Sequence, residues 1–160
     1  MTRIAIVTGA SGNLGQSVVR KFIAEGFIVI GTVAPNDSIT LDFSVDRFEK
    51  RVVELTNAAD SQKFAEAIIS KYGSIDVVVL TVGGFAMGTI ADTSSADIMK
   101  QYKLNFETTY HVARPAYVQM MKQNSGRIFI IGSKPGLDAM HGNGMVAYGL
   151  AKSLLFASLS

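Results

Sequence analysis

Short apolar runs alternate with longer amphipathic stretches along this chain of 160 residues. The runs are rich in Val and Ile and almost continuously apolar, which is typical of strands buried on both faces. This alternation predicts β-α-β units, and hence one α/β domain over 1–160 with a doubly wound parallel sheet and helices on both faces. The expected strands are 3–8, 27–33, 51–55, 75–81 and 127–132, and the expected helices are about 13–25, 60–72, 95–122 and 144–158.

The stretch 60–72 illustrates the helical period. Phe64, Ala67, Ile68 and Tyr72 recur at steps of three and four residues, so one face of the helix can cover the sheet. Asp60 or Ser61 is expected to cap its start, and Gly73 its end. Residues 34–50 are mixed and polar at first, which predicts a loop with a short helix at most.

Composition excludes several classes of protein. The net charge of +2 comes from scattered Lys and Arg, so no nucleic-acid partner is expected. The chain has no Cys and only two His residues, so we expect no metal. No apolar run approaches the ~20 residues of a membrane span, and the first residues do not resemble a signal peptide. We therefore expect a cytoplasmic protein with no membrane partner.

A glycine-rich turn joins the first expected strand to the first expected helix. Gly9, Gly12 and Gly15 would let the backbone turn sharply and approach a pyrophosphate, while free amides at the helix start face the anion. Asn13 stands where a further glycine is usual, and Asn tolerates a left-handed backbone. The context predicts a Rossmann-like dinucleotide site, although a tight turn without a ligand has the same glycines.

The end of the second strand decides between NAD and NADP in such a fold. Val33 and Ala34 occupy the positions of the usual acidic or basic residue, and Asp37 lies slightly late for a ribose contact. Asn36 or Ser38 would equally well donate to a phosphate. The preference between NAD and NADP stays open.

Tyr148 and Lys152 lie four residues apart, so their side chains project from one helix face. An ammonium ~4 Å from the phenol oxygen would stabilise the phenolate by about 4 kcal/mol at an effective dielectric of ~20, which suits a general acid. Ser133, after the strand 127–132, would hydrogen-bond the same substrate oxygen. Taken alone, the Tyr–Lys pair is an ordinary pair on a helix surface.

Polar and glycine residues elsewhere add to this pattern. Asn105 lies within the long helix 95–122, where it would bond to backbone and kink the helix, or would simply be an exposed or locally bonded residue. Val82-Gly83-Gly84 follows the fourth strand, at the sheet edge where α/β proteins bind ligands. His111 is expected to be a packed structural residue, and His141 is a candidate for the substrate pocket.

In the order of these motifs the chain resembles the short-chain dehydrogenase/reductase family over essentially its whole length. The resemblance implies that Tyr148 is the acid/base, that Lys152 binds the nicotinamide ribose, that Ser133 polarises the carbonyl and that Asn105 holds a proton-relay water. It implies NAD or NADP as cofactor, a small-molecule carbonyl or alcohol substrate, and a homodimer or homotetramer. Leu55 would contact adenine through its backbone. The implied cofactor contacts are Gly9, Ser11, Gly12, Asn13, Leu14, Gly15, Val33, Leu55, Val82, Gly83, Gly84, Tyr148 and Lys152.

Three other functions are considered beside this interpretation, together with the expectation that the domain is truncated. The runs 82–86 and 148–152 are also similar to dihydropteridine reductase, which implies a quinonoid pterin as substrate. Family members normally continue beyond the length of this chain, so we expect a truncated domain that lacks its last strands. A short chain would alternatively be a nucleotide-binding but catalytically inactive regulatory protein. A flavodoxin-like binding domain would leave Ser133, Tyr148 and Lys152 without a role.

Overall fold

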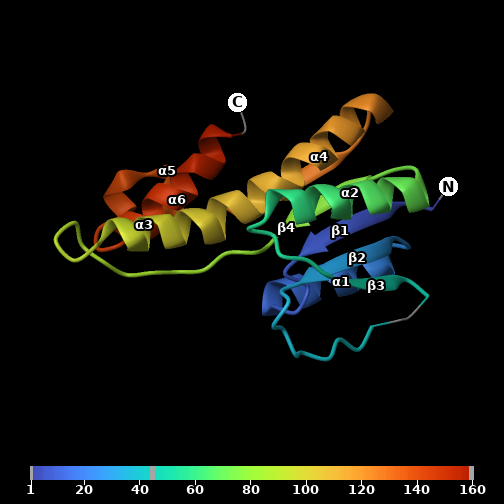
Figure 1. Ribbon diagram of the computed structural model, residues 1–160, viewed down its shortest axis with the longest axis horizontal. Coiled ribbons are helices and arrows are strands. Elements are labelled where there is room, and N and C mark those ends of the chain that lie inside the picture. The colour runs from blue at the N-terminus through green and yellow to red at the C-terminus, as the bar shows by residue number, and fades with distance from the viewer. Residues whose placement is uncertain (1, 44–45, 159–160) are drawn as a thin grey trace. The chain divides into compact units, whose positions relative to one another are not determined.

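The computed structural model describes residues 2–43 and 46–158, which form two compact units (Figure 1). The first unit consists of the chain up to Thr81 together with His111–Phe129. The second consists of Val82–Tyr110 and the chain from Ile130 onward. Each unit is described by itself, and a single domain over 1–160 stays a prediction.

A five-stranded sheet in the order β3-β2-β1-β4-β5 confirms the predicted doubly wound architecture. β1 pairs with β2 in parallel, with Ile4 opposite Ile28, and with β4 on its other side. β3 pairs in parallel with β2 at the edge of the sheet. The strands are β1 (Ile4–Thr8), β2 (Ile28–Val33), β3 (Phe48–Val52), β4 (Val77–Leu80) and β5 (Arg127–Ile130).

Helices α1 (Asn13–Ala24) and α2 (Ala58–Tyr72) lie on opposite sides of the strands of the first unit, and α2 is the upper one in Figure 1. Val19 of α1 belongs to the same buried cluster as Ala5 and Val7 of β1. Because side chains alternate along a strand, Ile4 and Ile6, which are also buried, project from the opposite face of the sheet. Both faces of the sheet are therefore apolar, as the continuous apolar runs predicted.

The prediction for α2 was wrong in two details. Asn57 caps its start, because the Asn57 side chain accepts hydrogen bonds from the amides of Ala59 and Asp60. Ala67 is exposed, and Ala65 is buried on the face that also carries Phe64 and Ile68. The predicted end is confirmed, since Gly73 adopts a left-handed conformation with φ of 78°.

The segment 34–47 contains no helix among its described residues. Leu41 and Phe43 instead pack against the core, and the Phe43 ring meets the Phe48 ring with centroids 4.6 Å apart. β3 starts at Phe48, three residues before the predicted strand 51–55. The sequence analysis missed the start of this strand because Glu49-Lys50-Arg51 is charged. An edge strand is partly exposed to solvent and does not need a continuous apolar sequence.

The second unit carries most of the remaining helices: α3 (Ser95–Tyr102), the π-helical turn η1 (Lys103–Glu107), the start of α4 (Thr108–Gln123), α5 (Lys134–Leu137), the 3₁₀ turn η2 (Ala139–His141) and α6 (Val146–Ala157). The predicted single helix 95–122 is therefore interrupted at 103–107. A capping box of Ser94 and Asp97 starts α3. An isolated parallel bridge between Gly88 and Met145 joins two loops of this unit.

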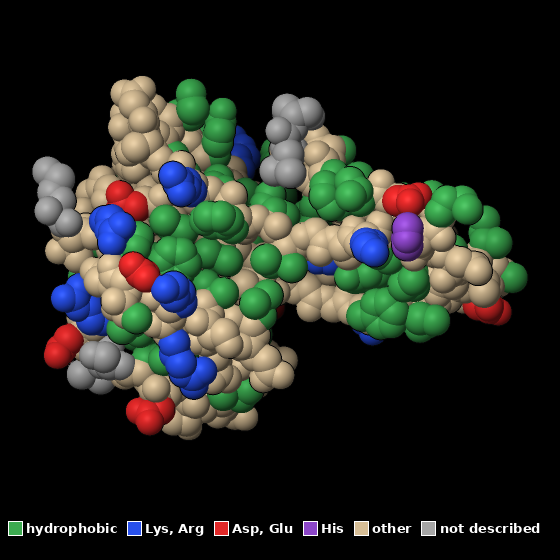
Figure 2. All heavy atoms as spheres, turned by 180° about the vertical axis from the view of Figure 1, so that it is seen from behind, with side chains coloured by type: hydrophobic (Ala, Val, Ile, Leu, Met, Phe, Trp, Pro, Cys, Tyr) green, Lys and Arg blue, Asp and Glu red, His purple; other side chains and the backbone are tan. Residues whose placement is uncertain are grey.

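Large apolar side chains remain at the surface, where Figure 2 shows them among charged ones. In the second unit the exposed ones include Phe85, Met87, Ile90, Met99, Leu137, Met140 and Leu150. No helix within 2–43 or 46–158 has the length and apolar character needed to cross a membrane.

Candidate functional site

The glycine turn of the first unit has the geometry expected of an anion site. Gly9 has a φ of 63°, and the Gly12 amide donates to the Gly9 carbonyl at 3.0 Å. A Cβ on Gly15 would lie 2.1 Å from the Gly9 carbonyl oxygen, so only glycine lets α1 approach the turn this closely. Gly12 occupies the cap position and offers no side-chain acceptor to the helix.

The amides at the start of α1 are therefore available to a ligand. Those of Ser11, Asn13, Leu14 and Gly15 donate to no acceptor within the described parts of the chain. Free amides at a helix start attract anions. Asn13 is the first helical residue, so the left-handed conformation considered for it was wrong; Gly9 supplies it instead.

The end of β2 offers no polar side chain to a ribose. Val33 is 2% exposed and closes the strand. Asp37, which seemed late in the sequence, reaches the glycine turn, where its carboxylate accepts a hydrogen bond from the Ser11 hydroxyl. Sequence spacing alone missed this contact, because the irregular backbone after Ala34 determines where Asp37 lies.

Leu55, the expected adenine contact, has a free amide. The Leu55 amide has no acceptor among the residues that the structure describes, whereas its carbonyl lies 2.9 Å from Nδ1 of His111. Oε1 of Glu54 accepts from the Thr56 amide at 3.1 Å and from the Thr56 hydroxyl at 2.7 Å. His111 therefore fixes the turn after β3, which gives the structural role predicted for it a specific partner.

Asn105 is fully buried inside the π-helical turn of the second unit. Its Oδ1 accepts from the Gly84 amide at 3.1 Å, and its Nδ2 donates to the Gly84 carbonyl at 3.0 Å. Nδ2 also contacts the Gln101 side chain at 2.8 Å and the Gln101 carbonyl at 3.2 Å. Asn105 therefore bonds to backbone groups, and its side chain ties the π-helical turn to the loop after β4.

Two buried polar groups, the Lys152 ammonium and the Ser133 hydroxyl, lie at the backbone segment that follows β5. Lys152 is 5% exposed, and its ammonium donates to the Ile131 carbonyl at 2.8 Å. Burial lowers the pKa of Lys152 below its usual value. The Ser133 hydroxyl is buried and has no hydrogen-bond partner among the described residues. An ammonium has three donors, so Lys152 keeps donors for a further acceptor.

Tyr148 lies on α6 one turn before Lys152. Nζ of Lys152 is 6.0 Å from the centroid of the Tyr148 ring, and the Phe85 ring meets the Tyr148 ring edge-on at 5.1 Å. A Cβ on Gly83 would lie 2.7 Å from Oδ1 of Asn105 and 3.4 Å from Nζ of Lys152. Within the second unit, the loop after β4 thus contacts the π-helical turn, which carries Asn105, and α6, which carries Tyr148 and Lys152.

The loop after β4 and the loop before α6 are joined to each other by hydrogen bonds. The Gly88 amide donates to the Gly144 carbonyl at 2.8 Å, and the Val146 amide donates to the Gly88 carbonyl at 3.0 Å. His141 is exposed, and its Nδ1 lies 2.9 Å from Oδ2 of Asp138. The Met140 amide and the His141 ring lower the pKa of Asp138.

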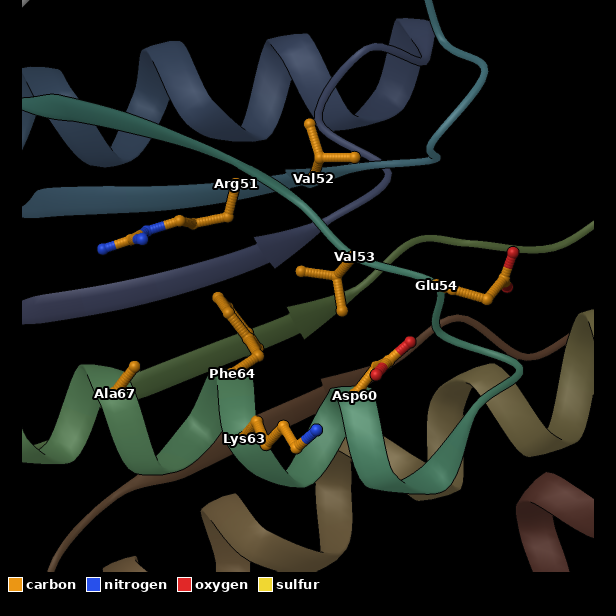
Figure 3. A pocket seen from close by; sticks show the side chains of 8 residues that line it. All are labelled: Arg51, Val52, Val53, Glu54, Asp60, Lys63, Phe64 and Ala67. Carbon is orange, nitrogen blue, oxygen red and sulfur yellow. The ribbon is translucent and has the colours of Figure 1, made fainter.

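A separate pocket of about 410 Å³ opens between β3 and α2 in the first unit (Figure 3). Its walls combine charged and apolar side chains, and none of the predicted cofactor residues lines it. The lining residues are Arg51, Val52, Val53, Glu54, Asp60, Lys63, Phe64 and Ala67. Within 2–43 and 46–158, no group of His, Asp or Glu has the arrangement of a metal site.

The predicted residues therefore gather in two sets. Gly9–Gly15, Val33 and Leu55 belong to the first unit. Asn105, Ser133, Tyr148 and Lys152 belong to the second, together with 82–84. Within the second unit, Gly83 lies close to the side chains of both Asn105 and Lys152.

The sequence is similar to that of known proteins over nearly its whole length. The family model described as short chain dehydrogenase matches residues 3–157. The chain is 30% identical over 153 residues to the cyclic-di-GMP-binding biofilm dispersal mediator protein of Escherichia coli, covering 96% of this chain and 62% of that protein. It is 28% identical over 149 residues to acetoacetyl-CoA reductase of Acinetobacter, covering 88% of this chain and 59% of the relative. The chain thus spans less than two thirds of the length of these relatives.

Solved structures show the same fold. A short-chain dehydrogenase from Streptomyces avermitilis superposes with a TM-score of 0.87 at 26% identity, covering 97% of this chain and 57% of that one. ElxO with NADP bound superposes with a TM-score of 0.86 at 23% identity, covering 98% of this chain and 65% of ElxO. The likeness to ElxO concerns the fold alone.

Proposed function

Because the chain belongs to the short-chain dehydrogenase family, we propose that it acts as an NAD(P)-dependent oxidoreductase on a carbonyl or alcohol substrate. The buried hydroxyl of Ser133, which has no hydrogen-bond partner in the described part of the chain, is the observation that carries this proposal. A buried hydroxyl without a partner costs stability, so it suggests a missing acceptor such as a substrate oxygen. The nearby anchoring of Lys152 to Ile131 supports a prepared site.

Residues proposed to bind the cofactor occur in each unit, and each unit is considered by itself. The free amides at the start of α1 and the close approach at Gly15 fit a pyrophosphate. The free amide of Leu55 suits a ring acceptor of adenine. In the second unit, Lys152 would bind the nicotinamide ribose, and the glycines after β4 would leave room for it. The full proposed set is Gly9, Ser11, Gly12, Asn13, Leu14, Gly15, Val33, Leu55, Val82, Gly83, Gly84, Tyr148 and Lys152.

When bound, the nicotinamide would supply the hydride or accept it. In the reductive direction the Tyr148 hydroxyl would give its proton to the substrate oxygen, and in oxidation it would take that proton back. The Lys152 ammonium would stabilise the charge that develops on the Tyr148 oxygen. Ser133 would donate to the same substrate oxygen. Asn105 would hold the π-helical turn against Gly84, where a proton-relay water is proposed.

The substrate class and assembly follow from the same proposal. A small carbonyl compound is the first candidate substrate, and a quinonoid pterin is the second. We also propose a homodimer or homotetramer, because the family resemblance implies an oligomer, and we propose a cytoplasmic location.

A nucleotide-binding regulatory protein is the second candidate function. The Escherichia coli relative is named for binding cyclic di-GMP and for mediating biofilm dispersal. A regulatory protein would bind a nucleotide through the same glycine turn but would not turn over a substrate.

Titration with NADH and NADPH, followed by nicotinamide fluorescence, and a turnover assay with a carbonyl panel and a quinonoid pterin test the proposal. Tyr148→Phe should lower turnover by about 10² or more and leave cofactor affinity nearly unchanged, because it removes the acid and keeps the ring. Tyr117→Phe, on an exposed tyrosine of α4, is the matched control and should change neither. Unchanged turnover in Tyr148→Phe contradicts the assigned acid, and nucleotide binding without turnover favours the regulatory protein.

A further inference from the structure

The four-residue turn 54–57, which follows β3, is closed by its own hydrogen bonds. The Asn57 amide donates to the Glu54 carbonyl at 3.0 Å. The Thr56 amide and hydroxyl donate to the Glu54 carboxylate at 3.1 and 2.7 Å. The Leu55 amide, in contrast, has no acceptor in the described part of the chain. The turn is therefore formed without this amide, which stays available to a ligand.

His111 of α4 holds the middle of this turn within the first unit. Its Nδ1 lies 2.9 Å from the Leu55 carbonyl oxygen, across 56 residues of the chain. A carbonyl oxygen only accepts hydrogen bonds, so Nδ1 carries the hydrogen of this contact. The carbonyl belongs to the peptide between Leu55 and Thr56, and the amide of the same peptide donates to Glu54. The central peptide of the turn is therefore fixed at both of its polar groups.

The orientation of the central peptide decides the type of a β-turn. Type II requires a positive φ at the third residue of the turn, which is Thr56 here, and Thr56 has no positive φ. A carbonyl turned away from His111 would lose the hydrogen bond to Nδ1. The amide and the carbonyl of Leu55 belong to one residue, so a fixed carbonyl also restricts the direction of the free amide.

A second side chain of α4 makes a similar contact at the other end of α2. Nε2 of Gln119 donates to the Gly73 carbonyl at 3.3 Å, also within the first unit. The Gly73 amide already donates to the Ile69 carbonyl at 2.8 Å. His111 and Gln119 thus both tie α4 to a turn next to α2, but only the turn held by His111 has a free amide on the residue that is held.

We propose that His111 is a positioning residue for nucleotide binding, because it holds the Leu55 carbonyl and so directs the Leu55 amide toward N1 of the adenine. The inference rests on the proposed function, since it assumes that the adenine of a dinucleotide lies at this turn. N1 of adenine accepts a hydrogen bond, whereas N1 of hypoxanthine carries a hydrogen and leaves the amide unpaired. NADH should therefore bind about tenfold more tightly than deamino-NADH, in which hypoxanthine replaces adenine.

Equilibrium titration of the full chain with NADH and with deamino-NADH tests the proposal. His111→Leu should weaken NADH binding about 3- to 10-fold and leave deamino-NADH binding nearly unchanged, so the preference between them should largely disappear. His111→Asn keeps a donor near the position of Nδ1 and should retain a preference of at least about fivefold. Gln119→Leu removes the matching hydrogen bond at the other end of α2 and should keep the wild-type preference. Circular dichroism checks that each variant is folded, and His111→Asn decides if His111→Leu does not fold.

The preference between the two nucleotides separates a positioning role from a structural one. A folded His111→Leu variant that weakens both nucleotides equally, or neither, shows a structural role only and contradicts the inference. Loss of the preference in His111→Asn, or to the same extent in Gln119→Leu, also contradicts it. A wild type that binds both nucleotides equally well overturns the inference and leaves the proposed oxidoreductase function standing. Binding of no nicotinamide nucleotide overturns the proposed function, and the inference with it.

Discussion

A methyl group added at Gly15 should destabilise the first unit by a predictable amount. The Cβ would lie 2.1 Å from the Gly9 carbonyl oxygen and 3.0 Å from the Cα of Ala10. Normal contact requires more than 3 Å, so α1 or the turn has to move by about 1 Å, and both are backbone. Overpacking of this kind costs about 1–3 kcal/mol, and we expect Gly15→Ala to lie at the upper end.

Thermal unfolding without nucleotide is the appropriate assay. For a chain of this size, about 2–3 kcal/mol corresponds to a fall in Tm of about 4–12 °C. Gly12→Ala is the matched control in the same turn, because its Cβ would lie 3.4 Å from the Gly9 oxygen and its φ is −70°. Equal Tm values for the two variants would falsify the close approach of α1 to the turn.

Two further variants test the second unit. Lys152→Met should abolish turnover. Burial lowers the pKa of Lys152 from 10.5, so between the lowered pKa and pH 10.5 the unfolded chain binds more protons than the folded chain. The wild-type free energy of unfolding should therefore rise with pH toward 10.5 relative to Lys152→Met in urea titrations, and parallel profiles would contradict the burial. Asn105→Ala should lower the free energy of unfolding by about 2–4 kcal/mol, because it leaves the Gly84 amide and carbonyl without partners. Chemical denaturation with exposed Asn36→Ala as the control measures this, and a loss no larger than the control's would refute the role of Asn105.

Local sequence patterns predicted most of the fold. Each buried strand carries its own apolar run, and the turn at 8–15 carries its own glycines, so neither depends on distant residues. The same holds for the end of α2, where Gly73 alone supplies the left-handed conformation. The prediction placed the edge strand β3 three residues too late. β3 is not buried and its sequence is charged, so it has no apolar run that would indicate a strand.

The sequence by itself determined the parallel sheet, the glycine turn and the placement of Tyr148 and Lys152 one helical turn apart on α6. The apolar run of each strand, the turn and the helix face each depend on residues close together in the chain, where backbone sterics and helical period fix the geometry. The parallel arrangement follows because helices separate successive strands, although it pairs residues as distant as Ala5 and Val77. Only the tertiary structure decided that Asn105 bonds Gly84, that His111 holds Leu55 and that Asp37 meets Ser11. Each of these contacts joins segments more than twenty residues apart, and a hydrogen bond of about 3 Å forms only when packing and loop conformation bring both partners together.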